Sequence, residues 1–183
     1  MLQRAKASGA PIAIYSNEAD PSEYDVGLID SVSRNHVAYR AVSPKGDFDG
    51  ERIVYVESIF RIDTGSSYLE KMRVLNENLT LAYSSPLESL ADEPDPESML
   101  REAQRQGQVV SIVDRIGYGP KGFVREVGSD YVEVERLDLN GLPDGSVVVM
   151  LDMVERIVIG GRDEQALAFL YRFQVESKRL IDG

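Results

Sequence analysis

The sequence predicts a mainly β protein with short flanking helices, built as two tandem five-stranded small barrels. Three observations predict this fold. The chain repeats itself at an offset of about 95 residues, each copy holds five short apolar segments separated by turn residues, and an acidic Pro- and Ser-rich segment divides the copies. We therefore expect a first repeat at residues 1–81, a linker at residues 82–97 and a second repeat at residues 98–183.

The repeat aligns residues 27–75 with residues 122–170 without a gap. Eleven of these 49 positions are identical, and four of the eleven are glycines at places where the chain must turn. An offset of 98 aligns the residues before Gly27, so one three-residue length difference reconciles the two offsets. Such self-similarity indicates a duplicated structural unit. The identical pairs are Gly27/Gly122, Val32/Val127, Val37/Val132, Gly46/Gly141, Asp49/Asp144, Gly50/Gly145, Val54/Val149, Arg61/Arg156, Ile62/Ile157, Gly65/Gly160 and Leu75/Leu170.

The charge distribution also separates the copies. Residues 82–97 hold five acidic and no basic side chains, for a net charge of −5, whereas each flanking repeat has a net charge of −3. Pro, Ser and acidic residues are typical of linkers. The linker therefore supplies almost half of the chain's net charge of −11.

Each copy is expected to open with a helix. In the second copy Asp95 suits the N-cap, Pro96 suits the first helical position, and Gly107 suits the left-handed end. The first copy has a shorter version of this pattern at residues 1–8, ended by Gly9.

Five short strands are expected to follow in each copy. Residues 131–137 alternate apolar and charged side chains, which is typical of a strand with one buried and one solvated face. Asn35 and Gly128 precede the third strand, where a tight turn favours residues that tolerate positive φ. The first copy's strands are predicted at 11–15, 24–32, 36–42, 53–56 and 59–62, with a polar loop containing Gly46 and Gly50 before the fourth. The second copy's strands are predicted at 109–113, 122–127, 131–137, 147–151 and 154–159.

A helix is expected to close each copy, capped by Ser66 or Ser67 in the first and by Asp163 in the second. Five bent antiparallel strands in so short a segment usually close into a small barrel, because closure removes exposed strand edges.

Two runs carry a resemblance to a known family. Residues 54–62 and 149–157 resemble the second motif of the Sm-like small barrel, where the fourth and fifth strands meet. Gly27 and Gly122 resemble the glycine of that family's second strand, and the order of one helix followed by five strands also matches. The SH3-like barrels share much of this pattern, so both barrel classes stay open.

The resemblance implies an oligomer in which the fourth strand of one barrel pairs with the fifth strand of its neighbour, and it implies RNA binding. The family's RNA contacts lie after the second strand and between the fourth and fifth strands; the first copy has Arg34, Asn35 and His36 at the former position, and the second has Gly128–Asp130. Phosphate binding needs local positive charge, and the net charge of −11 disfavours nucleic acid as a partner.

Composition bears on several other classes of function. The chain has no cysteine and one histidine, so it offers no thiolate metal site and no histidine cluster. No apolar run approaches about 18 residues, which excludes a membrane-spanning helix. We expect a cytoplasmic protein that is not an enzyme, with no catalytic, cofactor-binding or metal-binding residues and no cofactor.

Arg61 and Arg156 are the most specific charged pair, because both copies keep an arginine in an otherwise apolar strand. They are candidates for contact with a partner or an anion, as are Arg34, Asn35 and His36; an ion-paired structural role is the other interpretation. The sequence therefore predicts a non-catalytic protein-interaction or scaffold module that forms homo-oligomers through its barrel strand edges. The alternative is an Sm-like RNA-binding regulator.

Overall fold

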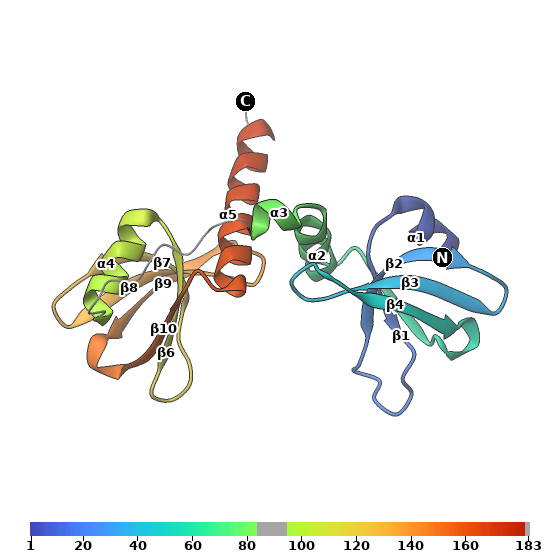
Figure 1. Ribbon diagram of the computed structural model, residues 1–183, viewed down its shortest axis with the longest axis horizontal. Coiled ribbons are helices and arrows are strands. Elements are labelled where there is room, and N and C mark those ends of the chain that lie inside the picture. The colour runs from blue at the N-terminus through green and yellow to red at the C-terminus, as the bar shows by residue number, and fades with distance from the viewer. Residues whose placement is uncertain (84–94, 182–183) are drawn as a thin grey trace. The chain divides into compact units, whose positions relative to one another are not determined.

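The computed structural model describes residues 1–83 and 95–181 (Figure 1). It contains two five-stranded antiparallel sheets in tandem, each with flanking helices, which confirms the predicted tandem arrangement. The residues divide into two compact units, Met1–Leu79 and Thr80–Gly183. The predicted linker, residues 82–97, lies largely outside the described residues.

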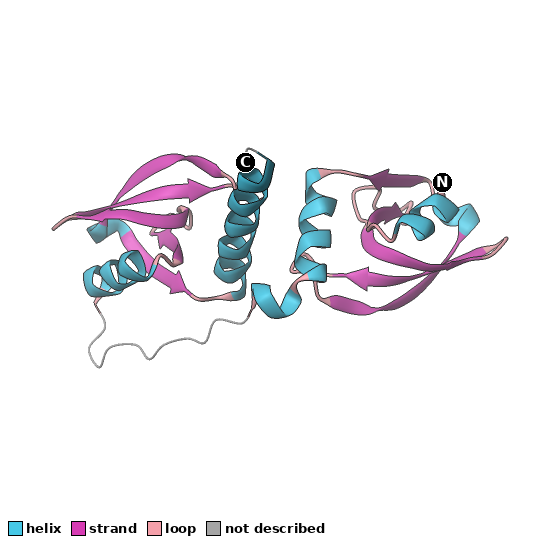
Figure 2. Ribbon diagram, turned by 90° about the horizontal axis from the view of Figure 1, so that it is seen from above, coloured by secondary structure: helices cyan, strands magenta, loops and turns pink. Residues whose placement is uncertain are grey.

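The fold class is mixed α/β, with 40% strand and 32% helix, rather than mainly β. The sequence underestimated the helical share because α5 runs for 20 residues, Arg162–Ile181, and because a short helix, α3 (Leu79–Ala82), follows α2. Figure 2 shows the helices of each unit lying outside its strands.

The first unit contains one sheet with strand order β4-β3-β2-β1-β5. Strands β4 and β5 are therefore its two terminal strands. The elements are α1 (Leu2–Ser8), β1 (Ile12–Tyr15), β2 (Asp25–Val32), β3 (His36–Val42), β4 (Phe48–Tyr55), the 3-10 helix η1 (Val56–Ser58), β5 (Arg61–Thr64) and α2 (Ser67–Glu77).

The second unit repeats this order as β10-β6-β7-β8-β9, with β9 and β10 as its terminal strands. Its elements after α3 are α4 (Pro96–Gln106), β6 (Val109–Asp114), β7 (Lys121–Val127), β8 (Tyr131–Leu137), β9 (Pro143–Met150), the 3-10 helix η2 (Leu151–Met153), β10 (Val154–Ile159) and α5.

Strand register shows that the two sheets are equivalent residue by residue. Ile12 of β1 lies opposite Gly27 of β2, and Val110 of β6 lies opposite Gly122 of β7. A Cβ atom on Gly122 would lie 1.9 Å from the carbonyl oxygen of Glu135, so this position admits only glycine. The offset of 98 therefore holds for the first strand of each copy, and the offset of 95 holds from the second strand onward.

Glycines also fix how the closing helix sits on each sheet. Gly46 and Gly141 both have positive φ, and a Cβ on either would lie 2.7 Å from the Cβ of a helix leucine, Leu75 or Leu170. The same close approach of loop and helix thus occurs in both copies, and it places α2 and α5 at equivalent positions.

The core of each unit lies between the sheet and its helices. In the second unit Leu100 and Ala103 of α4 pack with Val110, Val132 and Val134 of the sheet. In the first unit α1 supplies Ala5, and the sheet supplies Ile12, Ile14, Val37 and Tyr39. Val132 and Val134 are apolar positions of residues 131–137, the segment predicted to alternate, which explains why this strand could be predicted.

Three local predictions were wrong. Gly50 lies within β4 and not in a reversing loop, because the β3–β4 pairing continues past a bulge to Val42 opposite Phe48. The fifth strand of the first copy begins at Arg61, since residues 56–58 form η1. Asp163 does not cap α5, which begins at Arg162.

Candidate functional site

Two of the predicted site residues, Arg34 and Asn35, lie in the turn between β2 and β3, and a third, His36, begins β3. This turn lies against η1. The carbonyl oxygen of Asn35 accepts a 2.9 Å hydrogen bond from the amide of Val56. The His36 ring lies 4.6 Å from the Tyr55 ring, centroid to centroid. The structure thus brings together the two loops that the sequence identified separately.

The second unit repeats this contact with different chemistry. Here the carbonyl oxygen of Asp130 accepts a 2.8 Å hydrogen bond from the amide of Leu151. The side chains at this junction are acidic, with Asp130 in the turn and Asp152 in η2. The two copies therefore present the same backbone junction, with Arg34 and Glu57 in the first copy and only acidic charges in the second.

Arg61 lies on β5, away from that turn, and it is ion-paired. Its Nε and Nη2 atoms donate to the two carboxylate oxygens of Asp63 at 2.8 and 2.6 Å. Its guanidinium also lies 4.5 Å from the centroid of the Tyr15 ring, and the Tyr15 hydroxyl donates to Asp63 at 3.0 Å. The hydrogen bonds from Arg61 hold the pKa of the Asp63 carboxyl below its ordinary value.

Arg156 has a different environment, although it is equivalent to Arg61 by the repeat. Val113 and Val158 replace Tyr15 and Asp63 at the equivalent positions. Within the described residues Arg156 is exposed and has no ion pair. The two arginines therefore do not form one repeated site.

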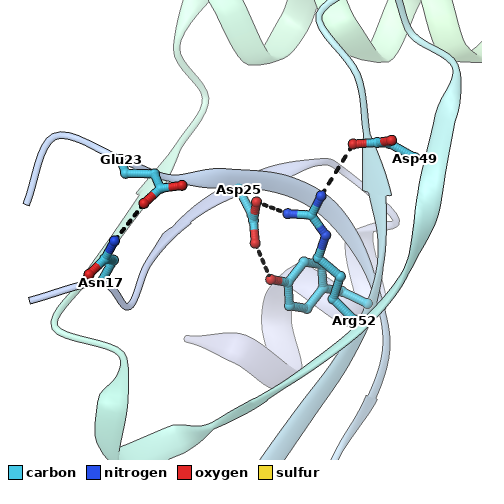
Figure 3. A network of polar contacts seen from close by, with 6 residues as sticks. Asn17, Glu23, Asp25, Asp49 and Arg52 are labelled. Atoms are coloured by element: carbon cyan, nitrogen blue, oxygen red, sulfur yellow. Dashed lines mark hydrogen bonds and ion pairs between the residues drawn. The ribbon is translucent and has the colours of Figure 1, made fainter. Parts of the chain in front are cut away.

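A polar network that the sequence did not predict connects β2, β3 and β4 of the first unit (Figure 3). Asp25 accepts a 2.6 Å hydrogen bond from the hydroxyl of the buried Tyr39 and an ion pair from Arg52. Arg52 also donates to Asp49 at 3.2 Å. Burial, and then the hydrogen bond to Asp25, raise the pKa of the Tyr39 phenol. The second unit has no counterpart, because Pro120, Val134 and Val147 occupy the equivalent positions.

The terminal strands β4 and β9 expose apolar side chains at matched positions. Ile53 and Val148 are 70% and 57% exposed, and Tyr55 and Met150, two residues further along, are 57% and 44% exposed. Beside β9 lies a surface hollow of about 500 Å³, lined by Tyr118, Pro120 and the apolar half of the strand among other residues. Both copies therefore expose apolar side chains at the end of the same terminal strand.

The described residues contain no group of three or more acidic or histidine side chains that could hold a metal ion. In the same ranges, no helix combines the length and apolar character that crossing a bilayer requires. The chain matches no protein-family model and no curated protein sequence.

Proposed function

We propose that the chain is a non-catalytic scaffold made of two small barrels of the Sm-like or SH3-like class, and that it binds further copies of itself through the free edges of β4 and β9. One observation carries this proposal: the outward-facing positions Ile53 and Val148 are apolar and exposed on the terminal strand of each sheet.

A terminal strand presents unpaired backbone amides and carbonyls, and proteins usually protect such edges with charge or proline. The first half of each edge strand here has this protection, from Asp49 and Glu51 in β4 and from Pro143 and Asp144 in β9. The end of each strand has none, since residues 53–55 and 147–150 are apolar. A partner strand paired there would satisfy the backbone groups and cover the apolar side chains.

A second copy of the chain supplies a suitable partner strand. Strands β5 and β10 are the other terminal strands of the two sheets, so each chain carries both kinds of free edge. Strand β10 reads Val154–Ile159, with apolar residues at four of its six positions. Pairing one edge strand with the other extends an antiparallel sheet across the contact and leaves fewer free edges.

Sedimentation velocity of the full chain at micromolar concentration tests the proposal. The wild type is expected to sediment as an oligomer, and the Ile53→Lys/Val148→Lys double variant is expected to sediment as a single chain, because two lysines must lose hydration to enter the contact. Leu139→Lys is the matched control: Leu139 is 73% exposed but lies in the β8–β9 loop, and this variant is expected to stay oligomeric. A wild type that sediments as a single chain contradicts the proposal.

RNA binding is the alternative, and one observation favours it. The turn after the second strand and the junction between the fourth and fifth strands lie together in both copies. Charge argues against it, because the second copy presents Asp130 and Asp152 there. Filter binding of single-stranded RNA across salt concentrations separates the two functions. Retention that falls steeply with salt supports the RNA-binding role, and no retention at low salt excludes it.

A further inference from the structure

The second unit contains a hollow of about 420 Å³, whereas the equivalent hollow in the first unit measures about 80 Å³. The repeat establishes that they are equivalent: Gly9, Leu28 and Asn76 line the small hollow, and their counterparts Gly107, Phe123 and Tyr171 line the large one. Small-molecule sites typically have volumes of about 300–1,000 Å³. Of these two equivalent hollows, only the one in the second copy reaches that range.

The chemistry beside the hollow changes between the copies as well. In the first unit Leu69 of α2 and Ala13 of β1 are 2% and 3% exposed and belong to one apolar cluster. In the second unit Glu164 of α5 and Ser111 of β6 take their places, 5% and 5% exposed, and the Ser111 hydroxyl donates a hydrogen bond to Oε1 of Glu164. An apolar contact has thus been replaced by a buried carboxylate and a hydroxyl.

That replacement is unfavourable for folding alone. Removing a carboxylate from water costs several kcal/mol unless hydrogen bonds and charges compensate. A carboxylate can accept about four hydrogen bonds, and Ser111 supplies one. Gly161 leaves space for the other oxygen, since a Cβ there would lie 2.4 Å from Oε2 of Glu164.

A second acceptor lies next along the helix. The side-chain nitrogen of Gln165 donates a 2.6 Å hydrogen bond to the carbonyl oxygen of Gly160. Its Oε1 atom is buried and has no hydrogen-bond partner among the described residues. Buried acceptors in proteins are nearly always paired, so the unpaired oxygen of Gln165 is an exception within the wall of the hollow.

Part of the remaining wall suits an apolar body. The rings of Phe123 and Tyr171 lie 4.9 Å apart at 64°, and Ala82, Val109 and Ala168 also line the hollow. The hollow is also lined by the C-terminal end of α4, where the helix dipole contributes negative potential, and by the first turn of α5, where it contributes positive potential. The one cationic side chain among the described lining residues is Arg172, which is exposed and donates to the Ala168 carbonyl at 3.3 Å.

We propose that this hollow is a binding site for a small organic cation, with an ammonium or guanidinium group donating to Glu164 and an apolar or aromatic body packed against Phe123 and Tyr171. Such a ligand supplies hydrogen-bond donors and a positive charge to the Glu164 carboxylate. The site does not involve the β4 and β9 edges, so failure of the scaffold proposal would not contradict it, and the reverse also holds.

Isothermal titration calorimetry of the full chain with benzylammonium, benzylguanidinium and the neutral benzyl alcohol tests the site. At least one cation is expected to bind at one site per chain, about tenfold or more tightly than the alcohol. Glu164→Gln is expected to weaken that binding about tenfold or more, and Glu164→Leu, which restores the residue type of the first copy, is expected to abolish it. Glu155→Gln, an exposed position on β10, is the control and is expected to bind like the wild type.

Three results would overturn the proposal: no saturable binding of either cation, equal affinity for the alcohol and the cations, or wild-type affinity in Glu164→Leu. Circular dichroism melts of each variant establish that loss of binding is not loss of folding. Glu164→Gln keeps the size and polarity of the side chain, so it tests the charge even where Glu164→Leu alters packing.

Discussion

The hydroxyl of Tyr39 donates a 2.6 Å hydrogen bond to Asp25, and the same carboxylate is ion-paired with Arg52. Tyr39 is 1% exposed, so its hydroxyl has no access to bulk water. The contact joins the start of β2 to the middle of β3, and Arg52 extends it to β4.

The first prediction is that removal of the Tyr39 hydroxyl destabilises the fold. Tyr39→Phe is expected to lower the free energy of unfolding by about 1–2 kcal/mol, because it removes a buried hydrogen bond to a charged group. Tyr131→Phe is the matched control: the Tyr131 hydroxyl bonds Glu126 at an exposed position, and this variant is expected to change stability by less than about 0.5 kcal/mol. Urea unfolding curves compare the two variants, and equal losses would contradict the structural role of the network.

The second prediction concerns stability when the buried pair Ser111 and Glu164 is replaced by the residue types of the first copy. Ser111→Ala/Glu164→Leu is expected to raise the free energy of unfolding by about 1–3 kcal/mol, since it replaces a buried carboxylate with the apolar pair of the first copy. The reciprocal Leu69→Glu is expected to destabilise the first unit by about 3 kcal/mol or more, because it buries a charge in an apolar cluster. Thermal unfolding of both variants tests this, and a destabilised Ser111→Ala/Glu164→Leu protein would show that Glu164 serves folding.

Two glycines of the second unit allow a test of the loop-helix contact. Both Gly141 and Gly145 have positive φ, of 80° and 73°, but a Cβ on Gly141 would lie 2.7 Å from the Leu170 Cβ, whereas the nearest atom to one on Gly145 is 3.7 Å away. Either substitution by alanine costs about 1 kcal/mol of backbone strain. Gly141→Ala is expected to lose about 2 kcal/mol more from the steric overlap. Chemical denaturation measures the difference, and similar stabilities for the two variants would contradict the close approach.

The fourth prediction concerns pH. Hydrogen bonds from Arg105, and then from Gln106, lower the pKa of the Glu102 carboxyl from its ordinary value of 4.5 to about 2. Because the folded-state pKa is depressed, these bonds stabilise the fold above pH 4.5, and their contribution is lost as the pH falls toward 2. A carbon-detected NMR titration is expected to give Glu102 a midpoint near 2.

Arg105→Ala is expected to return the Glu102 midpoint most of the way to its ordinary value, since Arg105 makes the largest contribution to the shift. Arg101→Ala serves as the control, because Arg101 pairs with Glu97 instead and lies on the same helix. An unchanged midpoint in Arg105→Ala would show that this ion pair does not form in solution.

The sequence predicted the tandem sheets because their determinants are local and periodic. Residues 36–42, 131–137 and 154–159 were predicted with the bounds that the structure has, and Gly27 and Gly122 stand at equivalent positions where a Cβ would overlap the neighbouring strand. The helix signals at Asp95 and Gly107 were also correct: Asp95 accepts from the Ser98 amide at 3.0 Å, and Gly107 has a left-handed φ of 62°.

The polar sites could not be predicted in this way, because they depend on registers between strands distant in sequence. Asp25, Tyr39 and Arg52 are ordinary residues in three separate segments until the β2–β3–β4 pairing brings them together. Glu164 resembles any acidic residue in the first turn of a helix. Comparison of the two copies could have identified it, since Glu164 aligns with a leucine, Leu69, in the other copy.

The covalent fusion of two sheets has a consequence for any assembly that the edges support. Each chain carries Ile53 on one edge and Val148 on another, so a single polypeptide offers two apolar edges for the same kind of contact. Substitution of only one of them leaves the other apolar edge and the β5 and β10 edges intact. Ile53→Lys chains mixed with wild type would therefore enter the complexes but make fewer contacts there, and would shift the size distribution toward shorter complexes.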